Sequence, residues 1–243
     1  MLIQWECLEE MDKLIEQWIV VDAIITDPPY WTTACKWDSV IPFEAMWERL
    51  NKLIKPNWAI ALFGSQPYSS ALVASNFKWF RYQWMWDKVS VSNPQLAKRQ
   101  PLKHYEDIII FSVKPHNYYP QWLVEIQNKK KPKWDGWAWS DLWKEQLGHI
   151  ARRKDYVQTH TNYPKWIIKY PRPNKPIHPT QKPVALMEYL IKTYSLENEI
   201  ILDFTAWSWS TWLACQNTNR KFIWIELDEN YYNIAKERLF INH

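Results

Sequence analysis

The chain has 243 residues, enough to bury a full core as one large domain or as one domain with an insertion. It contains no apolar run of roughly 18 residues and no basic-then-apolar leader, a pattern that predicts neither a membrane-spanning nor a secreted protein. The three cysteines are scattered without a Cys-x-x-Cys pair, which predicts a reducing, cytoplasmic setting, no disulfide framework and no metal site.

Strand and helix patterns alternate along the first half of the chain. A short strand is expected at Leu2–Cys7 and a weakly amphipathic helix at Leu8–Gln17. Further elements are expected as a helix at Pro42–Ile54, a strand at Ala59–Phe63, a helix at Ser69–Asn76, and strands at Phe80–Trp86 and Asp107–Val113. This βαβ spacing predicts an α/β fold with a mostly parallel, doubly wound sheet.

A carboxylate and an aromatic ring follow the apolar run Ile19–Thr26, which is typical of a strand buried on both faces. The strand is stopped by two prolines in Asp27-Pro28-Pro29-Tyr30, because proline has no N–H and a fixed φ. Ligands of open α/β sheets bind beyond the carboxyl ends of the strands. The turn is therefore a candidate functional site, with an ordinary Pro-rich turn as the alternative.

Basic residues are concentrated between Lys114 and Lys175. This segment holds 13 Lys and Arg against 5 Asp and Glu, a net charge of +8, whereas the whole chain carries only +4. Such a concentration is expected of contacts to a nucleic-acid backbone, and the alternative is a solvated face. The candidate DNA-binding residues are Lys129, Lys130, Lys131, Arg152 and Arg153.

The last part of the chain predicts a nucleotide-binding βαβ unit. A helix is expected at Val184–Tyr194, followed by a strand at Ile200–Phe204, a tight loop at Thr205–Trp209, a helix from Ser210, a strand at Phe222–Ile225 and a closing helix at Asn230–Leu239. An acid, Glu226, follows Asp203 by 23 residues, and its carboxylate would suit the two hydroxyls of a ribose.

Three motifs in order resemble the DNA amino-methyltransferases of the β-type permuted order. The catalytic motif is matched by Asp27-Pro28-Pro29-Tyr30, and the family's His-Pro-Thr-Gln-Lys-Pro by His178-Pro179-Thr180-Gln181-Lys182-Pro183. The family's cofactor loop, of the type Asp-Pro-Phe-Ala-Gly-Ser-Gly-Ser-Thr, is matched by Asp203-Phe204-Thr205-Ala206-Trp207-Ser208-Trp209-Ser210-Thr211. The likeness spans nearly the whole chain except roughly residues 115 to 160.

The resemblance implies a Rossmann-like methyltransferase fold that uses S-adenosyl-L-methionine to methylate adenine N6 in double-stranded DNA. It implies that the Asp27 carboxylate and the Pro28 carbonyl accept the two amine N–H groups, and that the Tyr30 ring stacks on a flipped base. It divides the chain into a catalytic half (1–113), a basic target-recognition insertion (114–165) and a cofactor-binding half (166–243). A restriction endonuclease is a possible partner, and the oligomeric state stays open.

The cofactor-binding residues that the resemblance implies fall into three groups. Glu6 and Cys7 follow the first strand, where Glu6 would approach the cofactor adenine or, equally well, cap a helix or face solvent. The other candidates are His178, Thr180, Lys182 and Pro183, the loop residues Asp203 to Thr211, and Glu226 with Leu227. His104 and Glu106 lie in a family-like segment, for which a structural role is expected.

Several alternative activities are weighed against this interpretation. Methylation of cytosine C5 would need a nucleophilic cysteine, usually after proline, and the chain has no Pro-Cys dipeptide. Cytosine N4 methylation uses the same geometry, and only the family's habit of Asp at position 27 favours adenine. An RNA or protein amine methyltransferase, or a DNA-binding homologue without catalysis, are further alternatives.

Tryptophan is abundant where glycine is scarce. The chain has 19 Trp and 3 Gly, whereas average usage would give roughly 17 Gly. A cofactor loop needs residues without Cβ, yet Trp207 and Trp209 occupy its glycine positions. We hypothesise a UGA codon that the source organism reads as glycine, at positions 5, 18, 31, 58, 207, 209, 212 and 224. Trp37 and Trp86 are expected to be genuine, since the family carries aromatics there.

Overall fold

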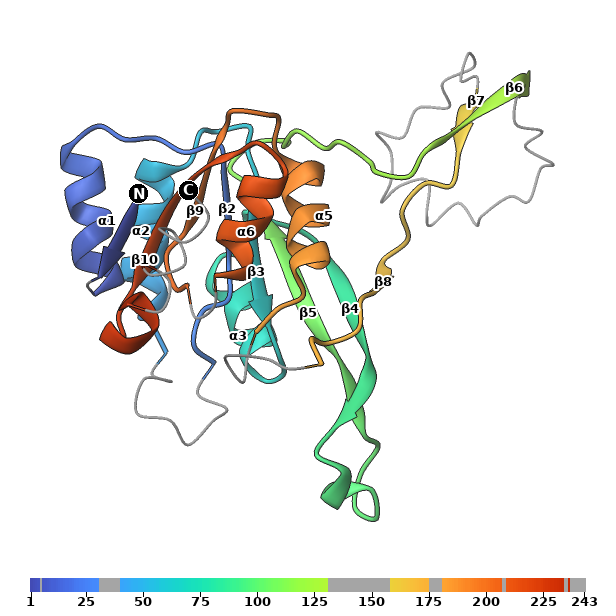
Figure 1. Cartoon of the computed structure of the whole chain (residues 1–243), viewed down its shortest axis with the longest axis horizontal. Coiled ribbons are helices and arrows are strands. Elements are labelled where there is room, and N and C mark those ends of the chain that lie inside the picture. The colour runs from blue at the N-terminus through green and yellow to red at the C-terminus, as the bar shows by residue number, and fades with distance from the viewer. Residues whose placement is uncertain are drawn as a thin grey trace. The chain divides into compact units, whose positions relative to one another are not determined.

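The computed structural model describes residues 1–4, 6–30, 40–130, 158–174, 181–206, 209–233 and 236 (Figure 1). These residues form two compact units, Met1–Tyr119 with Lys165–His243, and Pro120–Pro164. No helix in the described part is long and apolar enough to cross a bilayer. The described residues also hold no cluster of three or more His, Cys, Asp or Glu side chains suited to a metal ion.

The first unit is built on an eight-stranded sheet in the order β1-β10-β9-β2-β3-β5-β4-β8. The strands are β1 (Leu2–Gln4), β2 (Ala23–Thr26), β3 (Ile60–Gly64), β4 (Phe80–Ser92), β5 (Lys103–Phe111), β8 (Ile167–Lys169), β9 (Ile200–Asp203) and β10 (Lys221–Glu226). The first five strands in this spatial order, β1, β10, β9, β2 and β3, are all parallel, as the βαβ spacing predicts. The α/β fold with a mostly parallel sheet is confirmed.

The strand β5 departs from the parallel pattern, because it pairs antiparallel with both β3 and β4. Its connection from β4 contains only the short 3-10 helix Pro94–Leu96, too little for the crossover that a parallel neighbour needs. β4 and β5 therefore form a hairpin, visible at the lower right of Figure 1. The first strand is also shorter than expected, since Glu6 already caps the helix that begins at Cys7.

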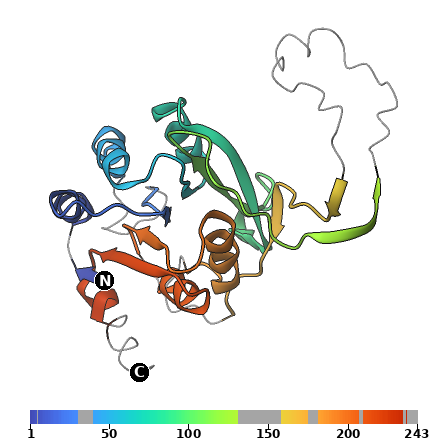
Figure 2. The same cartoon turned by 90° about the horizontal axis from the view of Figure 1, so that it is seen from above.

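Helices cover both faces of the sheet (Figure 2). Apolar side chains of α1 (Cys7–Glu16), α2 (Phe43–Leu53) and α3 (Tyr68–Ser75) pack on one face, and those of α5 (Val184–Tyr194) and α6 (Ser210–Asn217) pack on the other. β2 sends Ile24 to the first face and Ile25 to the second, so it is buried on both sides. Because helices pack on both faces, the central strands are held in place and their carboxyl ends lie at one edge of the sheet.

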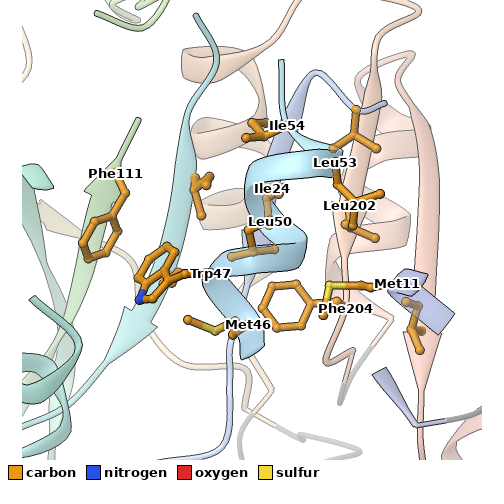
Figure 3. Close-up of a cluster of buried hydrophobic side chains, with 14 of the residues drawn as sticks. Met11, Ile24, Met46, Trp47, Leu50, Leu53, Ile54, Phe111, Leu202 and Phe204 are labelled. Carbon is orange, nitrogen blue, oxygen red and sulfur yellow. The ribbon is translucent and has the colours of Figure 1, made fainter. Parts of the chain in front are cut away.

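The core beneath α2 is close-packed. Figure 3 shows Met46, Trp47, Leu50 and Leu53 directed at the sheet, with the Trp47 ring 4.8 Å from the Phe111 ring. These four residues recur at helical spacing, which explains why the sequence periodicity located this helix to within one residue at each end. Burial of this stripe anchors the helix that connects β2 to β3.

The second unit, Pro120–Pro164, is described only in part. It contains a two-stranded antiparallel sheet of β6 (Val124–Lys130) and β7 (Gln158–Thr161). The backbones of Lys129 and Lys130 end β6, whereas Lys131, Arg152 and Arg153 lie outside the described residues. Their expected role in DNA binding stays a prediction.

Candidate active site

The carboxyl ends of β2 and β9 meet at the centre of the sheet. The two strands are parallel neighbours, with Ala23 opposite Ile201 and Ile24 opposite Leu202. This register brings Asp27 and Asp203, which end or follow the two strands, to the same edge. The segments come from opposite ends of the sequence, and such a junction is where open α/β sheets bind ligands.

Asp27 is engaged by a lysine and a tyrosine. Lys182 Nζ donates to Asp27 Oδ2, and the Tyr30 hydroxyl donates to Asp27 Oδ1. The side chains of Lys182 and Asp27 are both almost fully buried. The structure thus joins the Asp-Pro-Pro-Tyr turn to the His-Pro-Thr-Gln-Lys-Pro segment through one buried ion pair, although 155 residues separate the partners.

Two further charges extend this pair into a buried chain. Lys182 Nζ lies 3.4 Å from Glu106 Oε2, and Lys88 Nζ lies 3.0 Å from Glu106 Oε1. Glu106 and Lys88 face each other across the β4–β5 hairpin. The Lys182 ammonium also lies 5.0 Å from the centre of the Phe63 ring. The chain Lys88–Glu106–Lys182–Asp27 therefore pairs two carboxylates with two ammonium groups.

The pKa shifts in this chain follow from burial and neighbouring charge. Burial raises the pKa of Asp27 against the opposing effect of Lys182. Burial alone would lower the pKa of Lys182, but the Asp27 and Glu106 carboxylates outweigh it, so that pKa is raised and the ammonium stays charged. Burial alone would raise the pKa of Glu106, but Lys182 and Lys88 outweigh it and lower that pKa to about 2.

Asp203 organises the loop between β9 and α6. Its Oδ1 accepts from Thr26 Oγ1 at 2.6 Å, and its Oδ2 accepts from Thr211 Oγ1 at 2.6 Å. The Thr205 hydroxyl completes the cluster, 2.6 Å from Thr26 Oγ1. Burial raises the pKa of Asp203 to about 6. The carboxylate thus connects β2, the loop and the first turn of α6.

Glu226 ends β10 as a buried acid. Its Oε1 accepts the backbone N–H of Asp228 at 2.8 Å, and the following Leu227 is exposed. Burial raises the pKa of Glu226 to about 8, and Asp228 and Asp203 add to the shift. A buried carboxylate at this strand end can accept hydrogen bonds from the two hydroxyls of a ribose. Glu226 therefore fits the expected cofactor.

Indole rings crowd the same loop. Trp212 and Trp224 are buried against Ala206, and the Trp209 ring lies 6.2 Å from that of Trp212. Trp224 Nε1 donates to the Ala206 carbonyl at 3.2 Å. The crowding expected from tryptophan in a glycine loop is therefore present, although Trp209 itself has a negative φ of −58°.

The structure places the remaining predicted residues as follows. Glu6 caps α1 by accepting from the Glu9 N–H at 3.0 Å, and Cys7 opens that helix. Pro183 precedes α5, and Phe204 is buried in the core beneath α2. Ser210 opens α6 and donates to the Lys182 carbonyl at 2.8 Å. The predicted residues that lie outside the described part are His178, Thr180, Trp207 and Ser208.

Two residues at the site were not predicted from the sequence. Thr26 is fully buried and bonds Asp203, and its place directly before Asp27 could have indicated this role. No sequence motif indicates Lys88, because it reaches the site only through the pairing of β4 with β5 in the hairpin. Glu106, for which a structural role was expected, contacts the lysine that pairs with Asp27.

A model of the DNA methylase family with N6 and N4 specificities matches residues 21–237. The type II methyltransferase M2.LlaDCHI of Lactococcus lactis subsp. cremoris is 29% identical over 249 residues, which covers 90% of this chain and 82% of that protein. The crystal structure of the M1.HpyAVI–SAM complex is similar with a TM-score of 0.65 and 25% identity, covering 98% of each chain.

A cytosine-N4-specific enzyme is equally similar in fold. The PvuII DNA methyltransferase matches with a TM-score of 0.65 and covers 98% of this chain and 85% of its own, at only 13% identity. Fold similarity therefore does not distinguish adenine from cytosine as the target base.

Proposed function

The chain belongs to the N6/N4 DNA methylase family, and from that membership we propose that it methylates the N6 amine of a flipped adenine at a specific site in double-stranded DNA. The observation that carries the proposal is the buried Asp27 carboxylate at the carboxyl end of β2, beside the cofactor-type loop that Asp203 organises. S-adenosyl-L-methionine, bound at that loop, supplies an electrophilic methyl group.

The chain's own residues would orient the amine. Its lone pair is delocalised into the ring, so it becomes nucleophilic only when its hydrogens are held out of the ring plane. The Asp27 carboxylate and the Pro28 carbonyl would accept these two N–H groups. The amine would share Asp27 Oδ1 with the Tyr30 hydroxyl, since a carboxylate oxygen has two lone pairs.

The cofactor would be held by acids at neighbouring strand ends. Glu226 would accept the ribose hydroxyls, while Asp203 would keep the loop in shape through Thr26 and Thr211. The basic segment would contact the DNA backbone and contribute to target recognition. A restriction endonuclease with the same recognition sequence would be the partner in a restriction-modification system.

Asp rather than Ser at position 27 favours adenine over cytosine as the target base, by family habit alone. Cytosine N4 is the second candidate, since its exocyclic amine presents the same two N–H groups. A DNA-binding homologue without catalysis is the third, and the indoles around Ala206 favour it if those residues are tryptophan in the native protein.

The test is product analysis. DNA incubated with the native protein and the methyl donor is digested to nucleosides and separated by mass spectrometry. We expect N6-methyladenine. N4-methylcytosine would instead identify the cytosine enzyme, and retained DNA binding without either product would identify the inactive homologue.

A further inference from the structure

The backbone at Trp18 has the geometry of a glycine that ends a helix. Trp18 follows the C-cap of α1 with φ 58°, its N–H donates to the Ile15 carbonyl at 2.9 Å, and the next N–H, of Ile19, donates to the Leu14 carbonyl at 3.0 Å. This pair of bonds defines the helix ending in which glycine is the usual left-handed residue. The Trp18 side chain is 91% exposed, so packing does not offset the steric cost of its Cβ.

A second tryptophan shares this conformation. Trp122 has φ 62° and is 56% exposed. Among the described residues, left-handed backbone otherwise occurs at Val89 and at four asparagines, the type that tolerates it best after glycine. None of the described left-handed positions carries glycine, the residue that adopts this region most readily.

Other tryptophans have the opposite character. Trp84 and Trp86 are buried within β4 and donate their indole N–H groups to the Tyr194 hydroxyl at 2.6 Å and the Tyr170 carbonyl at 2.8 Å. These side chains are integrated into the core. At Gly64, where glycine is encoded, an added Cβ would lie 2.8 Å from Ser69 Oγ, so that side chain would have to shift. Trp18 and Trp122 therefore differ in structural character from Trp84 and Trp86.

We infer that Trp18 and Trp122 are glycine in the native protein. The same assignment for Trp209, Trp212 and Trp224 rests on the cofactor-type loop, which needs residues without Cβ, because none of the three has a positive φ. A UGA codon read as glycine in the source would account for the difference, with UGA at these positions and UGG at Trp84 and Trp86. The position at Trp58 has no positive φ, and positions 5, 31 and 207 lie outside the described residues, so these four rest on the sequence alone.

Peptide mass spectrometry of the protein purified from its source tests the assignment directly. We expect glycine at 18, 122, 209, 212 and 224, and tryptophan at 84 and 86. Tryptophan at 18 and 209 would overturn the inference, whether or not the protein methylates DNA.

Thermal unfolding of the protein as written provides a second test. Trp18→Gly should raise Tm by about 2–4 °C, the shift expected for relief of a left-handed side chain in a chain of this size. Trp18→Ala is the matched control, because it removes the indole but keeps the Cβ, and it should give little of that gain. Trp166→Gly, at an exposed position without positive φ, should not stabilise. Equal shifts for the Gly and Ala variants at position 18 would contradict the conformational argument.

A separate observation, the buried chain Lys88–Glu106–Lys182–Asp27, carries a second inference that rests on the proposed function. The Lys182 ammonium is shared by two carboxylates. Without the Glu106 charge, that ammonium would pair more strongly with Asp27 and weaken it as an acceptor for the target amine. We propose that Glu106, held by Lys88, is a positioning residue that keeps Asp27 available to the base.

Glu106→Gln tests this role, because it keeps the shape and removes the charge. We expect kcat to fall about tenfold or more with the cofactor KM unchanged. Burial is the main cause that raises the pKa of Asp27, and the Glu106 charge raises it further. Loss of that charge should lower the pKa of Asp27 and move the acid limb of the kcat profile to lower pH. Glu10→Gln, which removes a buried carboxylate paired with Lys13 elsewhere, should leave kcat unchanged.

A double variant guards against loss of folding. Lys88→Met with Glu106→Gln removes one charge of each sign and so preserves the balance of the buried chain. It should show the same change in kcat and in the acid limb. Wild-type activity with an unaltered pH profile in the folded variants would overturn this inference alone, whereas an inactive wild-type protein would overturn the proposed function.

Discussion

At the scale of the residue, Asp27 is the group on which the proposed chemistry depends. Asp27→Ala should lower methyl transfer by about 100-fold or more, because the amine loses its anionic acceptor. DNA and cofactor binding should largely persist, since Lys182 keeps Glu106 as a partner 3.4 Å away. Single-turnover methylation together with equilibrium binding measures both effects.

Asp22 offers a control on the same segment of chain. It is a buried carboxylate that pairs with Lys55 and accepts the Ile200 N–H, next to the amino end of β2 rather than the carboxyl end. Asp22→Asn should lower Tm without changing the rate of methyl transfer. A rate close to that of the wild type in Asp27→Ala would show that Asp27 is not the acceptor.

Single residues of the site could be predicted where a local motif encodes them. Asp27 and Lys182 were both predicted from short motifs, yet neither motif indicates that the two side chains meet. Lys88 could not be predicted, because only the antiparallel pairing of β4 with β5 places its ammonium beside Glu106. Contacts across the sheet require the topology, which local sequence does not contain.

At the scale of the element, the ends of β9 and β10 each carry a buried acid. The pKa of Glu226 is raised to about 8, so the folded protein binds this proton more tightly than the unfolded chain does. The resulting stabilisation is complete below the unfolded pKa of about 4.5 and is lost as pH rises through about 8. Glu226→Gln cannot titrate and should flatten the fall of Tm between pH 5 and pH 8.5 in the cofactor-free protein.

The pKa of Asp203 is raised to about 6, so Asp203 adds a smaller dependence of Tm on pH that the wild type and Glu226→Gln share. Glu229→Gln, three residues further along and exposed, should keep the wild-type dependence of Tm on pH. Cofactor binding should strengthen as pH rises through about 8, because the ionised carboxylate accepts hydroxyl protons. A Glu226→Gln variant with the wild-type slope would show that another group dominates.

Helix bounds followed closely from periodicity, whereas strand bounds did not: the strand expected over Ile19–Thr26 is Ala23–Thr26, and the one expected at Asp107–Val113 is Lys103–Phe111. The helix expected at Val184–Tyr194 is observed with those bounds, because its apolar positions recur at helical spacing and Pro183 precedes it. The β4 strand runs to Ser92, beyond the expected end at Trp86, because its last residues extend the hairpin rather than the core. Exposed strand residues lack the apolar pattern that would reveal them.

At the scale of the whole molecule, charge separates one segment from the rest. Residues 114–175 carry +8, so the remaining chain sums to −4. An acidic remainder is repelled by DNA, and the basic segment would have to provide most of the backbone contacts. This division follows from composition alone and does not require knowledge of the fold.

Neutralising the basic segment tests that division. Replacing Lys129, Lys130 and Lys131 by Gln, or Arg152 and Arg153 by Gln, should weaken DNA binding across all sequences. Each lost phosphate contact should reduce the slope of log K against log salt by roughly one unit. A triple variant of exposed lysines outside the segment, Lys52, Lys78 and Lys221 to Gln, removes the same charge as the first set and should leave the slope nearly unchanged. If instead the control lowers the slope and both segment variants do not, the DNA contacts lie on the methyltransferase sheet and its helices.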